Sequence, residues 1–238
     1  MIRTKALKKQ YGTVTAVDGL ELEIREGERF GLLGINGAGK STTVKMLSGL
    51  TKPTSGEIFI GGYRLPEEGQ QAKRLLGVSP QETAVAPNLS VRENLELLCG
   101  IYGMDKAATG QRIGELAEQL GLQEVLDRRA GKLSGGWQRR VSIAMAMVSR
   151  PKILFLDEPT LGLDVIARSE LWELIRTMPG TLLLTTHYME EAEALCHRIG
   201  IMKDGKLQAV GTARELMAQT GTARFEDAFI AIVKGGGV

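Results

Sequence analysis

The sequence has little of the material from which disulfide frameworks and structural metal sites are built. It contains two cysteines among 238 residues, Cys99 and Cys196, each in a segment with a helical pattern and neither within a Cys-x-x-Cys motif. This usage favours a reducing compartment and argues against a structural metal site. Cys196 precedes His197, but adjacent side chains on a helix point apart, so the pair does not predict a metal site. We expect both thiols to be buried as small hydrophobic groups.

Long hydrophobic runs are also missing. The longest apolar stretches, such as VSIAMAMV and ILFL, fall short of the ~20 residues that a membrane-spanning helix needs. The basic start of the chain, MIRTKALKKQ, is not followed by an apolar run, so a signal peptide is not expected. We therefore do not expect the chain to cross a membrane by itself.

Positive and negative charges are nearly balanced, with a small excess of positive charge. The 30 Lys and Arg residues and 28 Asp and Glu residues give a formal net charge of +2. A nucleic-acid-binding chain needs a basic surface or a recognisable motif, and the sequence offers neither, so we expect no nucleic-acid partner. Its hydrophobic content of 43% is ordinary for a globular protein, and a hydrophobic core is expected.

Short apolar runs alternate along the chain with amphipathic segments. RFGLLG, ILFLD, TLLLTT and RIGIM are each strand-like, and helix-like segments lie between them. This alternation predicts an α/β fold, a mostly parallel sheet with helices on both faces. LELEIREGE and GEIFIGGYRL instead alternate polar and apolar residues, which predicts a small antiparallel sheet. The turn at Asp204 to Lys206 is typical of a β-hairpin.

The strand pattern disappears between residues 89 and 126, where helical patterns take over. Ser90 with Glu93 predicts a capping box, and Asp105 is a candidate N-cap for the following helix. We expect one domain over residues 1–238. Its core and antiparallel β subdomain would occupy residues 1–88 and 127–238, and its helical subdomain residues 89–126, extending to a helix over residues 134–149. The last residues, from Lys234 on, are expected to be frayed.

A phosphate-binding loop is predicted where a strand pattern gives way to a helix pattern. GINGAGKST, Gly34 to Thr42, fits G-x-x-x-x-G-K-[ST] in that context. Glycines let successive amides surround a phosphate, Lys40 can reach the β- and γ-phosphates, and the Ser41 hydroxyl can bind Mg²⁺. The alternative is a glycine-rich turn that binds nothing. The residues expected to bind nucleotide are Asn36, Gly37, Ala38, Gly39, Lys40, Ser41 and Thr42.

Two adjacent carboxylates end the strand-like segment KILFLDEPT. Asp157 is expected to contact Mg²⁺, and Glu158 to act as the base that polarises an attacking water near the γ-phosphate. The alternative is an acidic cap at the end of a strand.

Three isolated polar or aromatic residues are weaker candidates. His187 ends TLLLTTH and Gln81 follows another strand pattern, and ligands of α/β sheets bind at such strand ends. Gln81 could hold Mg²⁺ or water, and Tyr11 could stack on a base. Each residue also has a purely structural interpretation.

The stretch LSGGWQRR, Leu133 to Arg140, places Ser134, Gly135 and Gly136 just before a helix pattern. Serine favours the N-cap, and glycines allow a ligand to approach the backbone. The unpaired amides and the dipole of a helix N-terminus favour anions. The alternative is a loop that ends where a buried helix begins.

Taken in chain order, Tyr11, GINGAGKST, Gln81, LSGGWQRR, ILFLDEPT, LGLD and His187 resemble the ATP-binding cassette of ABC transporters over nearly the whole chain. The resemblance implies a P-loop NTPase fold with a RecA-like core, and ATP with Mg²⁺ as its cofactors. It assigns Tyr11 to adenine stacking and Gln81 to Mg²⁺ and to communication with a membrane subunit. It assigns Asp164 to the loop that crosses the dimer and His187 to the γ-phosphate.

The details around TTHYMEEAEALCHRIGIMKDGKLQAVGT and RFEDAFIAIV are similar to the subfamily that serves ABC-2 type exporters, including drug efflux systems. Two positions depart from the family pattern. Trp137 stands where Gln or Met is common, and Ile35 replaces a frequent Pro. Neither change removes a phosphate-binding group.

The hypothesis that follows is an ATPase that energises transport. Two copies would enclose two ATP molecules, each bound by the phosphate loop of one copy and by Ser134 to Gly136 of the other. A membrane-spanning permease would be the second partner, received by residues 82–103, so the chain would lie peripherally on the cytoplasmic face of the membrane. The alternatives are an importer subunit, a soluble ABC ATPase of translation or DNA repair, and a regulatory module without turnover.

Overall fold

The computed structural model describes residues 1–235, which form two compact units. Met1–Leu76 and the chain from Gly180 onward make the first unit, and Gly77–Pro179 makes the second. The elements of the first unit are β1 (Ile2–Tyr11), β2 (Val14–Leu20), β3 (Glu23–Ile24), β4 (Arg29–Gly34), α1 (Lys40–Leu47), β5 (Ser55–Ile60), β6 (Tyr63–Leu65), α2 (Gly69–Lys73), β9 (Thr181–Thr186), α7 (Met189–Leu195), β10 (Arg198–Lys203), β11 (Lys206–Gly211), α8 (Ala213–Thr220) and α9 (Phe225–Lys234).

The second unit is built mainly from helices. Its elements are β7 (Leu76–Ser79), α3 (Val91–Ile101), α4 (Lys106–Leu120), short 3₁₀ turns at Gln123–Val125 and Ala130–Lys132, α5 (Gly135–Met147), β8 (Ile153–Asp157) and α6 (Val165–Thr177).

The central strand of the first unit is β4. It pairs in parallel with β10 on one side and with β9 on the other, and β11 continues the sheet beyond β10 as an antiparallel strand. All residues of β4 from Phe30 to Gly34 are buried, as are those of β9. Strands buried on both faces have continuous apolar sequences, so the predicted parallel sheet is confirmed. The predicted hairpin is also confirmed, with Lys203 opposite Lys206 and positive φ at Asp204 and Gly205.

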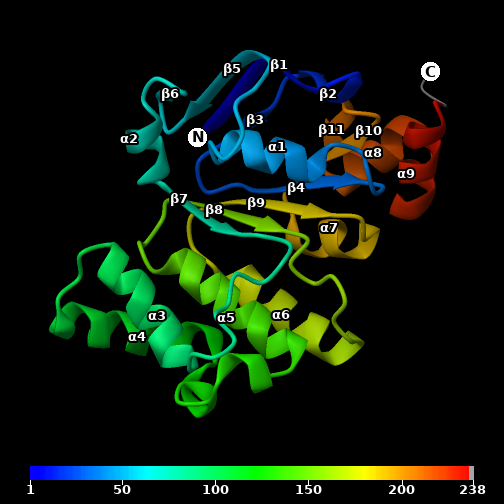
Figure 1. The fold of residues 1–238 in the computed structure, drawn as a ribbon. Coiled ribbons are helices and arrows are strands. Elements are labelled where there is room, and N and C mark those ends of the chain that lie inside the picture. Colours follow the sequence, from blue (N-terminus) through cyan, green and yellow to red (C-terminus); the bar gives the residue numbers. More distant parts are fainter. Residues whose placement is uncertain (236–238) are drawn as a thin grey trace. The chain divides into compact units, whose positions relative to one another are not determined.

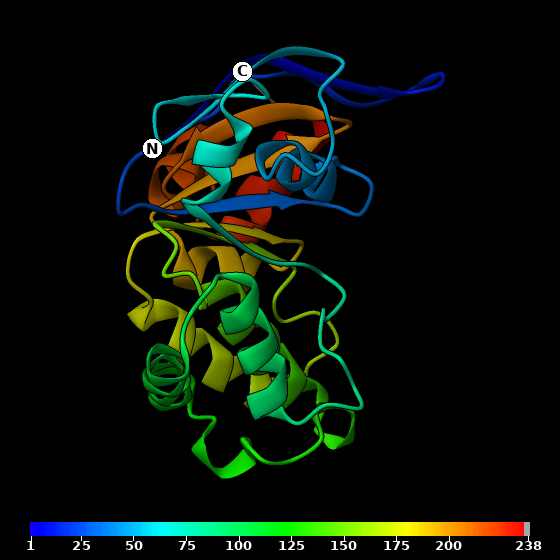
Figure 2. The same cartoon turned by 60° about the vertical axis from the view of Figure 1, so that its left-hand side comes forward.

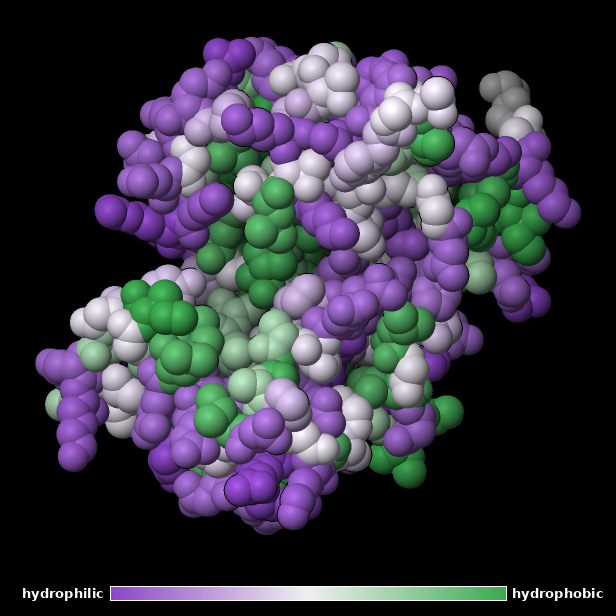
Figure 3. Space-filling view, in the orientation of Figure 1, coloured by the Kyte–Doolittle hydropathy of each residue, from purple (hydrophilic) through white to green (hydrophobic). Residues whose placement is uncertain are grey.

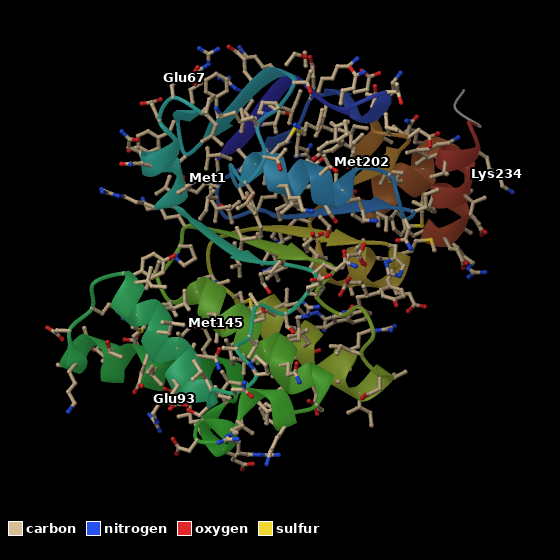
Figure 4. All side chains as sticks on the ribbon, viewed as in Figure 1. Met1, Glu67, Glu93, Met145, Met202 and Lys234 are labelled. Atoms are coloured by element: carbon tan, nitrogen blue, oxygen red, sulfur yellow. The ribbon has the colours of Figure 1, made fainter. Side chains whose placement is uncertain are left out.

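Helices cover both faces of this sheet, as Figures 1 and 2 show. Ile201 of β10 packs in a buried cluster with Leu216 of α8 and Phe225 of α9. The next residue, Met202, lies on the opposite face, where its sulfur is 4.0 Å from Thr43 Oγ1 of α1. Figure 4 labels Met202 at this position. Successive side chains of a strand point to opposite faces, so one strand joins two cores.

The antiparallel sheet of the first unit has the order β2-β1-β5-β6, with β3 also paired to β1. The predicted antiparallel character of residues 56–65 is confirmed by the pairing of β5 with β6. The predicted strand near residues 20–28 is reduced to the two residues of β3. The sequence did not predict β1, whose pairing with β5 shifts register between Lys5 and Lys8, where Ala6 has φ 44°. This bulge interrupts the alternation that would have marked a strand.

The helix starts of the second unit follow local capping signals. Ser90 and Glu93 form the predicted capping box of α3, and Asp105 accepts a hydrogen bond from Ala108 N at the start of α4. Figure 4 labels Glu93 in this first turn. Helix α5 begins at Gly135, one residue after the predicted start, and ends at Met147, two residues before the predicted end. The predicted boundaries of the subdomains stay a prediction. Residues 236–238, which belong to the predicted domain and to its predicted frayed end, lie outside the described residues.

The two cysteines lie in different units. Cys99 is fully buried on α3, as expected, whereas Cys196 is partly exposed directly after α7. Burial raises the pKa of both thiols. Within residues 1–235, no helix combines the length and apolar composition that crossing a bilayer requires.

Candidate functional site

The predicted phosphate-binding loop lies in the first unit, between the end of β4 and the start of α1. Gly37 and Gly39 have φ of 82° and 100°, a left-handed conformation that favours glycine. Gly39 is the N-cap of α1, makes no side-chain cap, and is followed by a first turn without an acidic residue. The helix N-terminus therefore presents its amides and its positive dipole end to an anion.

Two of the loop glycines are required by close packing. A Cβ on Gly34 would lie 2.5 Å from the carbonyl oxygen of Met202, and one on Gly39 would lie 2.4 Å from that of Ala16. The loop is thus pressed against β10 and β2. A Cβ on Gly37 would meet nothing within 4 Å, so Gly37 faces open space.

Lys40 carries its ammonium over the loop. The residue is 5% exposed, and its Nζ donates to the carbonyl oxygens of Gly34 at 2.7 Å and Ile35 at 3.3 Å. Phosphate oxygens are stronger acceptors than carbonyl oxygens, so the Lys40 ammonium can leave these two carbonyls and donate to a phosphate instead. Ser41 and Thr42 follow, half-buried, in the first turn of α1. Thr43, which the sequence reasoning missed, is fully buried and donates from Oγ1 to Gly39 O at 2.9 Å.

The first unit brings His187 to the same edge as the phosphate loop. The parallel register of β4 and β9 pairs Leu33 with Thr186, so His187 follows β9 where Gly34 ends β4. His187 is half-buried, and its ring centroid lies 4.0 Å from that of Tyr188. The strand register therefore places His187 at the sheet edge where the phosphate loop begins, and its role at the γ-phosphate stays a prediction.

Tyr11 lies on the β1–β2 hairpin of this unit. It ends β1, is 48% exposed, and has the Lys9 ammonium 4.8 Å from its ring centroid. The same hairpin touches the phosphate loop through the carbonyl of Ala16 near Gly39. An exposed aromatic face on a hairpin fixed to the loop is available for stacking.

The second unit holds the carboxylates. Asp157 ends β8 and Glu158 follows it, with exposed fractions of 6% and 5%. Glu158 has φ 49°, a left-handed conformation that costs a non-glycine residue energy, and such strain is retained at functional sites. β7 is the hydrogen-bonded neighbour of β8 in this unit, and the exposed Gln81 lies two residues beyond its end.

Ser134 is the N-cap of α5, and Gly135 and Gly136 are the first two residues of its first turn. The Ser134 side chain makes no cap hydrogen bond, and the first turn has no acidic residue. A Cβ on Gly136 would lie 3.0 Å from Ala167 Cβ of α6, so glycine lets the two helices approach. This N-terminus has the features of an anion site that the sequence predicted.

Asp164 begins the neighbouring helix α6. Its side chain accepts a hydrogen bond from Ala167 N at 2.9 Å, which makes it the N-cap. The residue predicted to lie in the dimer-crossing loop therefore also has a local structural role in this unit.

Arg139 of α5 is a residue that the sequence reasoning missed. It is 5% exposed and donates from Nη1 to Pro80 O at 2.7 Å and from Nη2 to Gln81 O at 2.5 Å. The available signal was its spacing of three and four residues from Ser142 and Ile143, both buried, which places it on the inward face of the helix.

The residues present fit a nucleotide with Mg²⁺ in their chemistry. The first unit contains the backbone amides at the start of α1, the Lys40 ammonium and the Ser41 hydroxyl, and the second contains the Asp157 carboxylate and the Gln81 amide oxygen. Mg²⁺ prefers oxygen ligands of these kinds together with phosphate oxygens. The assignment of each residue to a role in catalysis or binding stays a prediction.

Known proteins are similar to this chain in sequence and in fold. The profile of the family described as "ABC transporter" matches residues 17–161. The chain is 41% identical over 224 residues to the linearmycin resistance ATP-binding protein LnrL of Bacillus subtilis (strain 168), covering 93% of this chain and 72% of that protein. It is 43% identical over 214 residues to the Nod factor export ATP-binding protein I of Burkholderia pseudomallei (strain 1710b), covering 89% and 70%.

Solved structures give the same result. The structure of an ATP binding subunit of an ABC transporter matches with a TM-score of 0.85 and 30% identity, covering 98% of this chain and 99% of that one. The dimeric structure of a post-hydrolysis state of the ATP-binding cassette MJ0796, bound to ADP and Pi, matches with a TM-score of 0.80 and 29% identity, covering 89% and 98%.

Proposed function

The chain belongs to the ABC transporter family as an ATP-binding and ATP-hydrolysing subunit, and we propose that it powers an exporter through ATP-driven pairing of two copies. Export is supported by relatives whose names describe linearmycin resistance and Nod factor export. Pairing is supported by the similar cassette whose structure is a dimer.

The observation that carries this proposal is that one chain has two helix N-termini suited to bind an anion, each without a side-chain cap and without an acidic residue in its first turn. Gly39 of the phosphate loop is the N-cap of α1, and Ser134 is the N-cap of α5, which starts with Gly135 and Gly136. In the proposal, each ATP is bound by the loop of one copy and by Ser134 to Gly136 of the other. A two-fold axis makes both sites equivalent.

Each predicted residue has a role in the closed site. Tyr11 stacks on adenine, the amides from Asn36 to Gly39 surround the phosphates together with Lys40 and Thr42, and Asp164 reaches the partner copy. Ser41, Gln81 and Asp157 would hold Mg²⁺, which would supply positive charge beside the phosphates.

Glu158 and His187 act at the γ-phosphate. The Glu158 carboxylate accepts a proton from the water that attacks the γ-phosphorus, while the bond from that phosphorus to the β–γ bridging oxygen breaks. ADP keeps the bridging oxygen, and the γ-phosphoryl group leaves as inorganic phosphate. His187 donates a hydrogen bond to the γ-phosphate and so helps to orient it.

The second partner in the proposal is a membrane-spanning permease, which places the chain on the cytoplasmic face of the membrane. Residues 82–103 are its proposed docking segment. Leu97 and Ile101 of α3, and Tyr102 directly after this helix, are 51%, 71% and 52% exposed, and Figure 3 shows hydrophobic surface in the region of this helix. Exposed apolar groups that lie close together on a helix are typical of a protein interface.

Replacing Glu158 with Gln tests the function. The variant keeps the size of the side chain and loses its basicity, so we expect ATP turnover to fall by about 10²–10⁴-fold. ATP binding is retained, and size-exclusion chromatography with ATP and Mg²⁺ shows a stable dimer. Glu226→Gln, an exposed site on α9, is the matched control and keeps full turnover. Undiminished turnover of Glu158→Gln would defeat the assignment.

The direction of transport needs a separate test. A six-helix permease encoded beside this chain supports export, whereas a neighbouring periplasmic binding protein favours the importer alternative. Transport assays on the reconstituted complex decide between them, because an exporter accumulates substrate in inside-out vesicles.

A further inference from the structure

Arg139 lies on a helix whose opposite end is fixed by another arginine. At the C-terminal end of α5, Arg112 of α4 donates from Nε to Val148 O at 3.1 Å and from Nη2 to Met147 O. Near the N-terminal end, Arg139 donates to the carbonyls of Pro80 and Gln81. The two arginines are about equally buried, at 6% and 5% exposure, so they offer a matched pair with different targets.

A second contact on the same face of α5 supports the Arg139 contact. Ser142, one turn further along, lies 3.1 Å from Ser79 through their hydroxyl oxygens, in a buried position. Ser79 is the last residue of β7, directly before Pro80. Residues three apart on a helix share a face, so Arg139 and Ser142 together hold the end of β7 and the following backbone to α5.

The segment after Gln81 is held at its far end as well. Asn94 of α3 is fully buried, accepts from Ala86 N at 2.8 Å and donates to Ala86 O at 3.1 Å. Between Gln81 and Ala86 the chain has no helix or strand, and residues 82 and 84 are exposed. Residues 82–85 therefore form a short strap whose two ends are fixed by Arg139 and by Asn94.

We propose that Arg139 is a positioning residue that ties the Gln81 backbone to the helix beginning at Ser134–Gly136. This inference rests on the proposed function for the roles of Gln81 and of the helix N-terminus. Two N–H groups of one planar guanidinium hold two successive carbonyls, which fixes the orientation as well as the place of the peptide. When an anion binds at the N-terminus of α5 and displaces the helix, the hydrogen bonds of Arg139 move Gln81 with it. A permease that binds residues 82–85 displaces α5 through the same hydrogen bonds.

The first experiment tests the tie itself by amide hydrogen exchange on the full chain. Arg139→Gln removes one charge and the paired donors, so exchange in residues 81–86 rises by about tenfold or more. Arg112→Gln, the matched control, raises exchange near Met147 and leaves residues 81–86 as in the parent. Arg139→Lys, which offers a single ammonium, gives an intermediate rate. Equal exchange of residues 81–86 in Arg139→Gln and the parent overturns the proposal.

The second experiment tests the consequence for the reaction. The Mg²⁺ concentration that gives half-maximal ATP turnover rises severalfold in Arg139→Gln, is restored in part by Arg139→Lys, and is unchanged in Arg112→Gln. In a Gln81→Ala background the Arg139→Gln change has no further effect on this concentration, because both act through one group. Additive effects of the two substitutions overturn the proposal.

Failure of the proposed function has a different signature. If Gln81→Ala alone leaves the Mg²⁺ requirement unchanged, the metal role of Gln81 is wrong. The exchange experiment then still decides whether Arg139 holds the strap.

Discussion

Arg140 places its guanidinium over the ring of Trp137, with the guanidinium carbon 4.8 Å from the ring centroid. The same guanidinium forms an ion pair with Glu170 of α6. Trp137 therefore helps to fix the side chain that joins α5 to α6. Its place in the LSGGWQRR stretch, where the family commonly has Gln or Met, is accounted for by a contact within this chain.

Trp137→Gln is expected to lower the free energy of unfolding by about 0.5–1 kcal/mol, the size of a partly exposed cation–π contact. ATP turnover is expected to be retained, because the phosphate-facing backbone of Ser134 to Gly136 does not change. Urea unfolding followed by circular dichroism and a phosphate-release assay measure the two effects. Trp137→Phe, which keeps a ring under Arg140, is the control and loses less stability. A variant that keeps its stability and loses turnover would show that the ring acts on nucleotide instead.

Gly39→Ala and Gly37→Ala form a matched pair within the phosphate loop. Both positions have positive φ, which costs an alanine about 1–2 kcal/mol. Only at Gly39 does the added methyl also meet backbone, at 2.4 Å from Ala16 O. We expect Gly39→Ala to be the less stable variant and to lose ATP binding, measured by thermal unfolding and by fluorescence of a bound nucleotide analogue. Equal stability of the two variants would mean that β2 yields to the methyl group.

Asn94→Asp is expected to destabilise the protein by about 3 kcal/mol at neutral pH. The amide nitrogen of Asn94 donates to Ala86 O at 3.1 Å and to Ser90 O at 2.9 Å, and a carboxylate there would face two carbonyls with no proton to offer. Protonation of the new carboxyl restores a donor, so the loss shrinks as the pH falls. Urea unfolding at pH 5 and pH 8 measures this. Asn94→Ala, which cannot titrate, should show no such recovery, and an Asp variant equally unstable at both pH values would contradict the prediction.

The two capping boxes predict how stability changes in acid. Hydrogen bonds from the Ser90 backbone and hydroxyl lower the pKa of Glu93, and those from Thr212 lower the pKa of Glu215. A carboxyl whose pKa is lower in the folded state stabilises it above the unfolded pKa of about 4.3, and this stabilisation is lost as the pH falls through the folded value. Gln keeps the capping oxygen and removes the titration. Glu93→Gln and Glu215→Gln should therefore flatten the fall of the melting temperature below about pH 5, additively because the two boxes belong to different units and share no residue. If the melting temperature of the double variant falls with decreasing pH as steeply as that of the parent, the two capping boxes do not cause this fall.

The features predicted best from the sequence are those encoded by neighbouring residues. The phosphate loop required only Gly34 to Thr42 and its flanking patterns, and the capping box of α3 required only Ser90 and Glu93. Turn chemistry at Asp204 and Gly205 likewise fixed the hairpin. In each case the determining contacts span a few residues, so local propensity and tertiary structure agree.

The features that were missed depend on contacts between distant residues. β1 is interrupted by a bulge at Ala6, so its burial does not alternate, and its partner β5 begins at Ser55. Arginine on a helix is usually exposed, but Arg139 is buried, and its guanidinium donates hydrogen bonds to carbonyls 58 and 59 residues away in the sequence. A charge on a helix is usually solvated, and only the tertiary structure shows which charge is not.

The position of β4 has a consequence for synthesis of the chain. Both of its neighbours in the sheet, β9 and β10, come from beyond residue 180, and the turn at Gly205 donates to Ala38 O and accepts from Asp18 N. A nascent polypeptide that has passed the ribosome only as far as residue 180 carries the complete GINGAGKST motif without the strands that shape it. Bound nucleotide can stabilise the folded phosphate loop only after the last quarter of the chain has emerged. Newly made protein therefore passes through a stage in which the GINGAGKST motif has been synthesised but its binding site has not yet formed.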